Sequence, residues 1–446
     1  MSSVKDLVDF AVARGDDGYE EARQGIVWQE NVPDRFPDVI VKVKNQLEVA
    51  QVVQWAAANN LKVSARSGGH AWAASSLRDG GVLVDLSALD SIEVDVESHL
   101  ARVGPGTKGE QLNGALAPHD LFFPTGHCPS VGLGGFLLGG GYGVAGGKRE
   151  SCMSVRAVDV VTPQGELIRA DETRNVDYYW AARGSGAGFF GVVTSFHLEV
   201  YPRPNVGMNL SVTFPLSRWE EALRWSLTIS DKLDNDVELY LLIGGYPDSE
   251  DPSVINLGVL VAATIFADSE EAALAALQPL KDCPVAEAAI GEAVPTTIEE
   301  IYALNDLIDP PGYRYAVDNM WTSAGIDDLI PQLAPIIDNL PSPRSYLLWW
   351  LWTADDEETA AVSSPGPSFY SAYAIYEDAA DDERAISWVT ENMRALEPWS
   401  NGVQLNDENL GRRYFRPLSD PKLKKLEELR DKHDGSRRFF SFPGLE

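Results

Sequence analysis

Cysteine is scarce in this sequence, with three residues among 446: Cys128, Cys152 and Cys283. Three cysteines cannot build a disulfide framework, and their spacing matches neither a CxxC redox pair nor a zinc ribbon, so no metal site is expected. Such sparse use of cysteine is typical of proteins that work in a reducing compartment.

Basic charge is also scarce, because 36 lysines and arginines face 67 aspartates and glutamates and leave a formal net charge of −31. Surfaces that bind nucleic acid or anionic membranes need clustered lysine and arginine to neutralise phosphate. The charge balance therefore argues against a nucleic-acid partner and against binding to an anionic membrane.

Long apolar runs are missing as well. A membrane-spanning helix needs about 18 to 20 unbroken apolar residues, and even the apolar run 347–352 is bounded by Arg344 and Asp355. The first ten residues carry acids where a signal peptide needs an apolar core, and they contain no twin arginine. We therefore expect a soluble, cytoplasmic protein with no membrane partner.

The first half of the chain alternates short apolar segments with glycine-rich turns. At roughly 150 residues per domain, the length predicts two or three domains. Residues 46–58 predict a helix, and the apolar residues that recur in it at intervals of three and four are Leu47, Ala50, Val53 and Ala57. Strands are predicted at residues 61–65, 81–86, 155–161, 165–169 and 191–200, and as a hairpin of 92–96 with 100–103. The segment from Val39 to Pro204 is therefore expected to be an α+β unit.

A second α+β unit is expected between about 205 and 395. Strands are predicted at 238–243 and 255–265, and an acidic helix at 269–280. Two later strands, 345–352 and 368–376, place many aromatic side chains on alternating faces. Two interpretations stay open: the aromatics form a core that faces helices, or they form a wall for a ligand.

A first motif, Ser64–Trp72, follows a predicted strand and contains Arg66-Ser-Gly-Gly-His70. Two consecutive glycines let backbone N–H groups turn inward, and such a nest of donors binds phosphate oxygens. Taken alone, however, the motif is more often an ordinary turn with a hydrogen-bonded structural histidine.

A second motif is the glycine-rich run 126–143, which has eight glycines in eighteen residues and includes Cys128. Backbone needs so many glycines where it approaches something closely or takes positive φ repeatedly, and a flat cofactor supplies such a reason. Cys128 itself could be only a small buried apolar residue. Gly141–Gly146 formally matches GxGxxG. We reject a Rossmann site there, because no clean strand precedes the match and too few residues follow it for a crossover helix.

With these motifs, the sequence resembles the FAD-linked oxidases of the vanillyl-alcohol oxidase superfamily, in the berberine-bridge-enzyme-like branch. The residues that carry the resemblance are Arg66–His70, Gly126–Gly135, Gly139–Gly143, Trp180–Gly186 and Gly191–Ser195. Residues 423–439 match the family more weakly. The resemblance implies a two-domain α+β fold of the PCMH type. Its expected parts are an FAD-binding domain at 1–204, a substrate-binding domain with an antiparallel sheet at 205–395, and a C-terminal segment at 396–446 that returns to the FAD domain.

The resemblance also implies an FAD held by two covalent bonds, from His70 to the flavin 8α-methyl carbon and from the Cys128 sulfur to C6. Imidazole and thiolate are both nucleophiles able to attack an electrophilic flavin. The further cofactor-binding residues that it implies are Arg66, Ser67, Gly68, Gly69, Ser76, Val131, Gly132, Gly134, Gly135, Gly139, Gly140, Gly141, Tyr142, Gly191 and Val193.

The implied activity is that of an oxidase, which removes a hydride from an alcohol or similarly activated C–H bond of a small organic substrate and reduces O2 to H2O2. Two alternatives stay open: a dehydrogenase with a non-oxygen acceptor, and a catalytically degenerate flavin- or ligand-binding protein. In this family a small valine at the position of Val131 goes with oxygen access to the ring, which favours the oxidase. Sugars, phenolic alcohols and polycyclic natural products are all possible substrates, and the oligomeric state is left open.

One departure from the family pattern concerns the active-site base. The family's C-terminal segment usually contains a Tyr-x-Asn whose phenol can take a proton, whereas the best matching triplet here is Gln404-Leu-Asn406. Tyr142 is then expected to serve as the base, with Tyr373 as a weaker partner, although a phenol with a pKa of about 10 needs lowering or a concerted transfer. Tyr142 could instead only shape the pocket.

Overall fold

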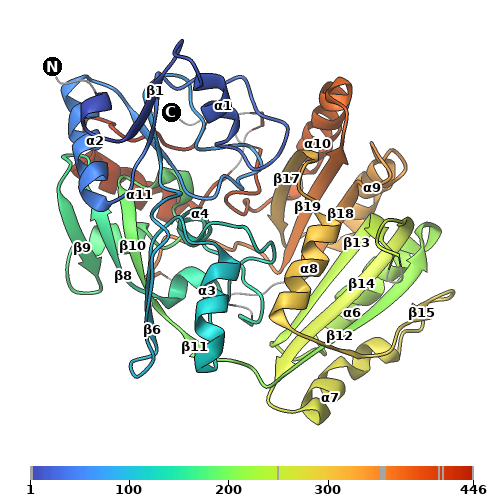
Figure 1. Ribbon diagram of the computed structural model, residues 1–446. Helices are drawn as coiled ribbons and strands as arrows, with labels where there is room; N and C mark the ends of the chain where they lie inside the picture. Colours follow the sequence, from blue (N-terminus) through green and yellow to red (C-terminus); the bar gives the residue numbers. More distant parts are fainter. Residues whose placement is uncertain are drawn as a thin grey trace.

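The computed structural model of the chain describes residues 4–147, 149–248, 251–351, 358–409, 412–413 and 416–443. Two units lie side by side (Figure 1). One holds the first half of the chain together with helix α11 (Asp420–His433), and the other holds strands β12 to β19 with their helices. The expected two-domain α+β architecture is confirmed.

Two sheets form the frame of the first unit. In spatial order, the first contains β1 (Phe10–Ala13), β2 (Val39–Lys42), β4 (Val82–Asp85) and β3 (Val63–Arg66). The second contains β5 (Ile92–Asp95), β6 (Leu100–Val103), β10 (Val192–Glu199), β8 (Val155–Val161) and β9 (Leu167–Asp171). Strands β2, β4 and β3 are parallel, whereas the second sheet is antiparallel throughout and includes the predicted hairpin. Each strand predicted in this half is present, with ends that shift by one to two residues.

Helix α2 (Gln46–Ala58) has the predicted bounds, but its buried face is only partly the predicted one, with Val53 fully buried in both and Ala50 packed against the core. The predicted stripe began at Leu47, whose side chain is 65% exposed. The residues buried against the first sheet are Val49, Val52, Val53 and Ala56. These also recur at three and four residues, so the sequence contained two competing stripes, and the valine-rich one packs on the sheet.

The remaining elements of the first unit are short. They are α1 (Tyr19–Gln24), α3 (Gly109–Leu116), α4 (Leu133–Leu138), α5 (Val176–Ala181) and the two-stranded pair of β7 (Leu121–Phe122) with β11 (Tyr201–Pro202). Helix α4, not a strand, precedes the GxGxxG match, and the described residues between that match and β8 contain no crossover helix. The rejection of a Rossmann site is therefore consistent with the structure.

An eight-stranded antiparallel sheet forms the centre of the second unit. Its order is β15 (Ala289–Ile290), β12 (Val206–Pro215), β14 (Ile255–Ala267), β13 (Val237–Pro247), β18 (Tyr346–Leu351), β19 (Ser368–Tyr376) and β17 (Arg314–Thr322), with β16 (Val294–Thr296) beside β12. Four helices enclose a large hydrophobic core on one face: α6 (Trp219–Ser230), α7 (Glu270–Lys281), α9 (Ile326–Ile337) and α10 (Asp382–Leu396). Helix α8 (Ile298–Ile308) lies between this sheet and the first unit (Figure 1).

Each interpretation of the aromatic strands holds for one face of the large sheet. Trp349 and Tyr370 belong to the core beneath the helices. Tyr346, Trp350 and Tyr373 point to the opposite side and line a cavity. Alternation of side chains along a strand accounts for both results. Trp352, which the predicted strand included, lies outside the described residues.

The C-terminal helix α11 and its tail pack on the first unit (Figure 1). Arg430 of this helix donates hydrogen bonds to the carbonyls of Gly188 and Phe439, each at 3.0 Å. Phe439 forms a parallel bridge with Val63, at the start of β3. The tail therefore adds to the structure that supports the loop bearing His70. In the described part of the chain, no helix is long and apolar enough to cross a membrane.

Candidate active site

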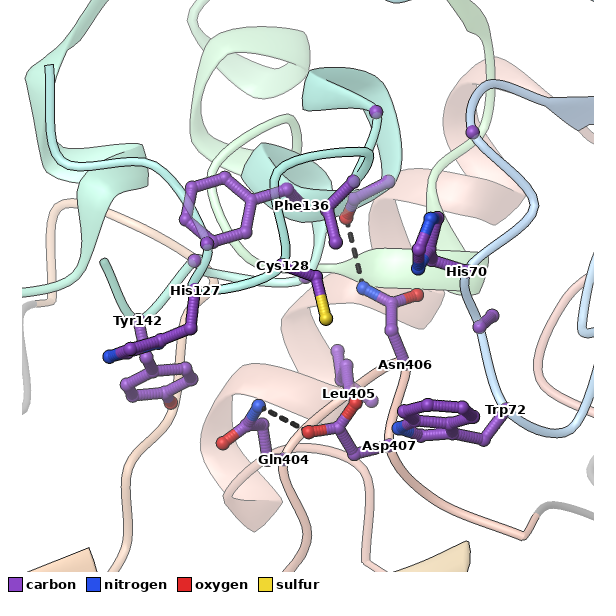
Figure 2. A pocket seen from close by; sticks show the side chains of 18 of the residues that line it. His70, Trp72, His127, Cys128, Phe136, Tyr142, Gln404, Leu405, Asn406 and Asp407 are labelled. Atoms are coloured by element: carbon purple, nitrogen blue, oxygen red, sulfur yellow. Dashed lines mark hydrogen bonds between the residues drawn. The ribbon is translucent and has the colours of Figure 1, made fainter. Parts of the chain in front are cut away.

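A cavity of about 610 Å³ lies between the two units. Its walls come from the segment 63–78, the glycine-rich run 126–142, helix α8, the aromatic face of the large sheet and the segment 404–407. Figure 2 shows labelled side chains from the first, second and last of these. Cofactor and small-molecule sites typically enclose about 300 to 1,000 Å³. The cavity therefore has the size of a ligand site.

The site residues predicted from the sequence gather around this cavity, and all but Gly140 line it. Gly140 lies behind the wall. Its carbonyl accepts a hydrogen bond from the Cys152 amide at 2.8 Å, and a β-carbon on Gly140 would meet the Val362 side chain at 2.9 Å. A φ of +109° makes glycine necessary there for the turn itself. The sequence motif could not separate this requirement from contact with a ligand.

His70 enters the cavity from the loop after β3 and is held on two sides. Its Nε2 lies 3.0 Å from the Ser130 hydroxyl, and its ring stacks on Trp28 with the ring centroids 4.5 Å apart. Burial, followed by the charge of Arg66, lowers the pKa of His70 to about 3. The imidazole is therefore uncharged at neutral pH and keeps the lone pair that a nucleophile requires.

Cys128 reaches the same cavity from the glycine-rich run (Figure 2). Its Sγ donates to the side-chain oxygen of Asn305, on α8, at 2.9 Å. Burial raises the pKa of the thiol well above its usual value, and Asp309, Asp306 and Asp407 raise it further. The thiol is therefore protonated at neutral pH, and attack on an electrophile requires the loss of that proton.

Arg66 fixes the turn that carries His70. Its guanidinium lies 3.1 Å from the Asp85 carboxylate and donates to the carbonyls of Ile26 at 3.0 Å and Gly68 at 3.3 Å. Gly69 has a φ of +77°, and a β-carbon on it would lie 2.2 Å from the Ile26 oxygen. The two-glycine turn is thus held in one conformation, and glycine is necessary at position 69.

Tyr142 and Tyr373 both line the cavity with buried phenols. The Tyr142 hydroxyl lies 2.8 Å from that of Ser364, which donates to the Glu150 carboxylate at 2.6 Å. Burial, followed by the charge of Glu150, holds the pKa of Tyr142 well above its usual value. Burial, followed by the charge of Asp407, does the same to the pKa of Tyr373. Both phenols therefore keep their protons at neutral pH and are suited to donate hydrogen bonds.

The triplet Gln404–Asn406 borders the cavity near Cys128 and Trp72 (Figure 2). Asn406 Nδ2 donates to the Gly135 carbonyl at 2.9 Å, and the Asn406 carbonyl accepts from the Trp72 amide at 3.1 Å. Gln404 Nε2 donates to Asp407 Oδ2 at 2.8 Å. A carboxylate therefore stands beside the position where the family pattern has a phenol.

Several ionisable residues that line the cavity were missed by sequence reasoning, among them His127, Glu238, Asp309 and Asp407. His127 and Asp407 are direct neighbours of Cys128 and Asn406, and this adjacency could have identified them. Glu238, on β13, and Asp309, at the end of α8, reach the cavity only through the fold, and no local pattern marks them. The described residues contain no group of three or more His, Cys, Asp or Glu side chains placed to hold a metal ion.

Two of these missed residues form a close pair, in which His127 Nε2 lies 2.6 Å from Glu238 Oε1. Burial acts to lower the pKa of His127, but the charge and hydrogen bond of Glu238 raise it above its ordinary value. Asp309 accepts a hydrogen bond from the Tyr346 hydroxyl at 2.8 Å. Burial raises the pKa of Asp309 to about 7.

Comparison with known proteins agrees with this geometry. Residues 37–171 match the family model of an FAD binding domain. The FAD-linked oxidoreductase nodO of Hypoxylon pulicicidum is 31% identical over 425 residues, which cover 94% of this chain and 93% of that protein.

Two solved structures share the fold over nearly the whole length. The 6-hydroxy-D-nicotine oxidase of Arthrobacter nicotinovorans has a TM-score of 0.81 at 20% identity and covers 96% of each chain. The BBE-like 1 protein of Physcomitrella patens has a TM-score of 0.83 at 19% identity and covers 99% of this chain and 98% of its own. Fold and cavity together define a two-domain flavoprotein. The chain belongs to the FAD-linked oxidoreductases, with the fold of the berberine-bridge-enzyme-like members of the vanillyl-alcohol oxidase superfamily, and is an FAD-dependent oxidoreductase.

The residues around the cavity fit an FAD. Its lining combines the glycine backbone of 68–69 and 132–141 with two nucleophilic side chains and with two cations, Arg66 and Arg78. Glycine backbone can approach a flat ring closely, and inward-turned amides bind phosphate oxygens. When bound, FAD supplies the capacity to accept a hydride and to pass on two electrons.

Proposed function

We propose that the protein is an oxidase that removes a hydride from an alcohol, or from a similarly activated C–H bond, of a small organic substrate and reduces O2 to H2O2. The observation that carries the proposal is that His70 and Cys128 come from two separate segments and line one cavity with the predicted glycine-rich wall. That combination is the one the family resemblance requires for an FAD linked through both residues.

The covalent linkage is part of this proposal. The neutral imidazole of His70 can attack directly, whereas the Cys128 thiol must first lose its proton. The Asn305 side chain holds the Cys128 Sγ at 2.9 Å and thereby orients it toward the cavity. We assign cofactor binding to the predicted set that lines the cavity, and to Gly140 only the support of the wall.

We assign the cofactor unit to residues 1–204 together with the tail 396–446, and the substrate unit to 205–395. Support for the first boundary comes from β12, which begins the large sheet at Val206. Support for the return of the tail comes from the bridge between Phe439 and Val63. The aromatic face of the large sheet then covers the substrate end of the cavity.

Oxidase chemistry is favoured over a dehydrogenase by two points. The solved relative from Arthrobacter nicotinovorans is itself an oxidase, 6-hydroxy-D-nicotine oxidase. Val131, the small residue that in this family goes with oxygen access, lines the cavity. None of the three cysteines is in a disulfide, which supports a reducing compartment such as the cytoplasm.

Anaerobic flavin bleaching tests the proposed function. The yellow holoenzyme is mixed with a panel of sugars, phenolic alcohols and polycyclic alcohols, and absorbance is followed without oxygen. Bleaching by at least one alcohol, followed by stoichiometric peroxide on admission of air, is the expected result. Bleaching without reoxidation by air would select the dehydrogenase, and the absence of bleaching across the panel would select a binding protein.

A further inference from the structure

The segment Gln404–Asp407 is fixed against both units. The Gln404 amide donates to Asn319 Oδ1 at 2.8 Å, and Asn319 Nδ2 donates back to the Gln404 carbonyl at 3.0 Å. Asn319 is fully buried on β17, and Leu405, which is 6% exposed, lies in the core of the first unit. The side chains of Gln404 and Asp407 are therefore presented to the cavity from a rigid backbone.

The Gln404 amide and the Asp407 carboxylate act as a pair of acceptors. Because Nε2 donates to Asp407 at 2.8 Å, the amide oxygen Oε1 points away from the carboxylate (Figure 2). That oxygen is buried and has no hydrogen-bond partner among the described residues. A buried acceptor costs free energy until a ligand or a water donates to it. The pair thus offers a ligand a neutral carbonyl next to a carboxylate.

A second carboxyl controls the charge of this pair. Asp309 lines the same cavity, is 7% exposed and is held by the Tyr346 hydroxyl at 2.8 Å. Among the described lining residues, the only arginines are Arg66 and Arg78, both from the segment 63–78, and there is no lysine. Burial, followed by the charge of Asp309, raises the pKa of Asp407 to about 7.

Other titratable groups face Asp407 from each neighbouring element. Besides Asp309 at the end of α8, they are Cys128 on the glycine-rich run, Tyr373 on β19, Tyr142 and Glu408. The pKa of each of these four is raised well above its usual value, first by burial. Cys128, Tyr373 and Tyr142 are therefore protonated at neutral pH, whereas Asp309 and Asp407, each with a pKa of about 7, are partly ionised there.

We propose that Asp407 is the catalytic base, which takes the hydroxyl proton of an alcohol substrate while Gln404 holds the carboxylate and accepts a second donor from the same substrate. In this step the substrate O–H bond breaks, and its proton forms a bond to an Asp407 oxygen. The O–H electron pair closes the new C=O bond as the C–H pair leaves as hydride, which the bound FAD would accept. Reduction of O2 to H2O2 then uses the two electrons and the hydrogen of that hydride together with the proton that Asp407 returns, so the carboxylate is restored. The proposal rests on the proposed oxidase function.

Asp407 suits this role better than the phenols do. A general base works best when its pKa lies near the operating pH. Gln404 cannot ionise, and Tyr142 and Tyr373 keep their protons at neutral pH. The proton acceptor that the triplet Gln404–Asn406 lacks is thus supplied by the next residue in the chain.

The test is the pH dependence of anaerobic flavin bleaching by the best alcohol of the panel, in holoenzymes whose flavin spectra match. In the wild type, the bleaching rate should rise with pH through an apparent pKa of about 7. We call this rise of the bleaching rate with pH the acid limb. Asp407→Asn should slow bleaching by about 10² to 10⁴-fold and abolish the acid limb. Asp407→Glu should restore the limb. Asp309→Asn removes the repelling charge, so it should keep the limb but move it to lower pH.

Glu408→Gln is the matched control, because Glu408 is a buried carboxyl in the same segment that does not line the cavity. It should keep the acid limb and slow bleaching far less than Asp407→Asn does, although the limb can shift because Glu408 faces Asp407. A wild-type limb that survives in Asp407→Asn would overturn the proposal while leaving the oxidase intact. If no alcohol bleaches the wild type, the proposed function fails and the proposal fails with it.

Thermal unfolding provides a readout besides activity. Asp titrates at about 3.9 in an unfolded chain, whereas Asp407 titrates at about 7 in the folded protein. Between these values the folded state binds more protons, so this group's contribution to stability falls as pH rises. The Tm of Asp407→Asn, relative to the wild type, should therefore increase from pH of about 4.5 to about 7.5. If the difference in Tm between Asp407→Asn and the wild type does not change with pH, Asp407 has no raised pKa and the proposal is overturned.

Discussion

Gly68 and Gly132 are in backbone contact: a β-carbon on Gly68 would lie 2.5 Å from the Gly132 nitrogen, and one on Gly132 would lie 2.6 Å from the Gly68 nitrogen. Gly68 belongs to the turn that carries His70, and Gly132 follows Cys128 by four residues. The spacing between the two nucleophiles thus depends on the absence of two side chains. Neither glycine has a positive φ, so close approach alone is the reason for glycine here.

Gly132→Ala should force these two segments apart. Overpacking of this kind costs about 1 to 3 kcal/mol, and the displaced nucleophiles should link less flavin. The measurement is the fraction of flavin that remains on the polypeptide after acid denaturation, together with Tm. Gly114→Ala is the control, because a β-carbon there meets nothing within 4 Å in helix α3. That variant should gain about 0.5 to 1 kcal/mol and keep its flavin. Full double linkage in Gly132→Ala would contradict this account.

The proposed covalent linkage predicts a specific pattern of colour retention. In the wild type, yellow colour should stay with the polypeptide after acid or detergent denaturation, because the two proposed bonds would hold the ring. His70→Ala and Cys128→Ala should each retain it through the other residue, and only the double variant should release it. Absorbance of the precipitated protein measures the bound fraction. Release of all flavin from the denatured wild type would disprove both linkages.

Much of this architecture could be predicted from local sequence, because strand pattern and turn chemistry act over a few residues. The hairpin of β5 with β6 and the bounds of α2 are examples. The buried face of α2 was predicted only in part, since Val53 and Ala50 pack on the sheet but Leu47 is exposed, and only the sheet beneath decides between two overlapping apolar stripes. The alternation of Trp349 and Trp350 was clear, but which side holds helices and which holds a cavity is a property of the assembled sheet.

Residues that line the cavity were predicted where they lie in contiguous motifs. They were missed where the fold brings together segments that are distant in the sequence. His70 and Cys128 lie in contiguous motifs that are weak when taken alone but specific in combination. Asp309 approaches Asp407 only because α8 ends beside the aromatic face of the sheet, nearly a hundred residues earlier in the chain. Burial also reverses a chemical expectation, because it raises the pKa of Tyr142 rather than lowering it as a base would need.

We expect the size of the side chain at position 131 to control how fast oxygen reoxidises the reduced enzyme. It lines the cavity three residues after Cys128, and a larger side chain there should narrow the path to the ring. Val131→Leu should slow reoxidation by air far more than it slows reduction by substrate. Stopped-flow absorbance measures both half-reactions separately. Val131→Ala serves as the control and should reoxidise at least as fast as the wild type. Equal rates of reoxidation in Val131→Leu and the wild type would refute the idea that Val131 controls oxygen access.

Tyr142→Phe separates the two candidate bases. The sequence favoured Tyr142 as the base, and loss of a general base slows a reaction by about 10² to 10⁴-fold. In the structure, the Tyr142 hydroxyl contacts Ser364 at 2.8 Å and keeps its proton. We therefore expect it to orient the substrate, and its removal should forfeit one hydrogen bond, about 0.5 to 1.5 kcal/mol or roughly tenfold at most.

The acid limb of flavin bleaching should persist in Tyr142→Phe, because Asp407 still titrates. Ser364→Ala, which removes this contact but keeps the Tyr142 hydroxyl, should have a smaller effect. A loss above a hundredfold together with disappearance of the limb would return the role of base to Tyr142.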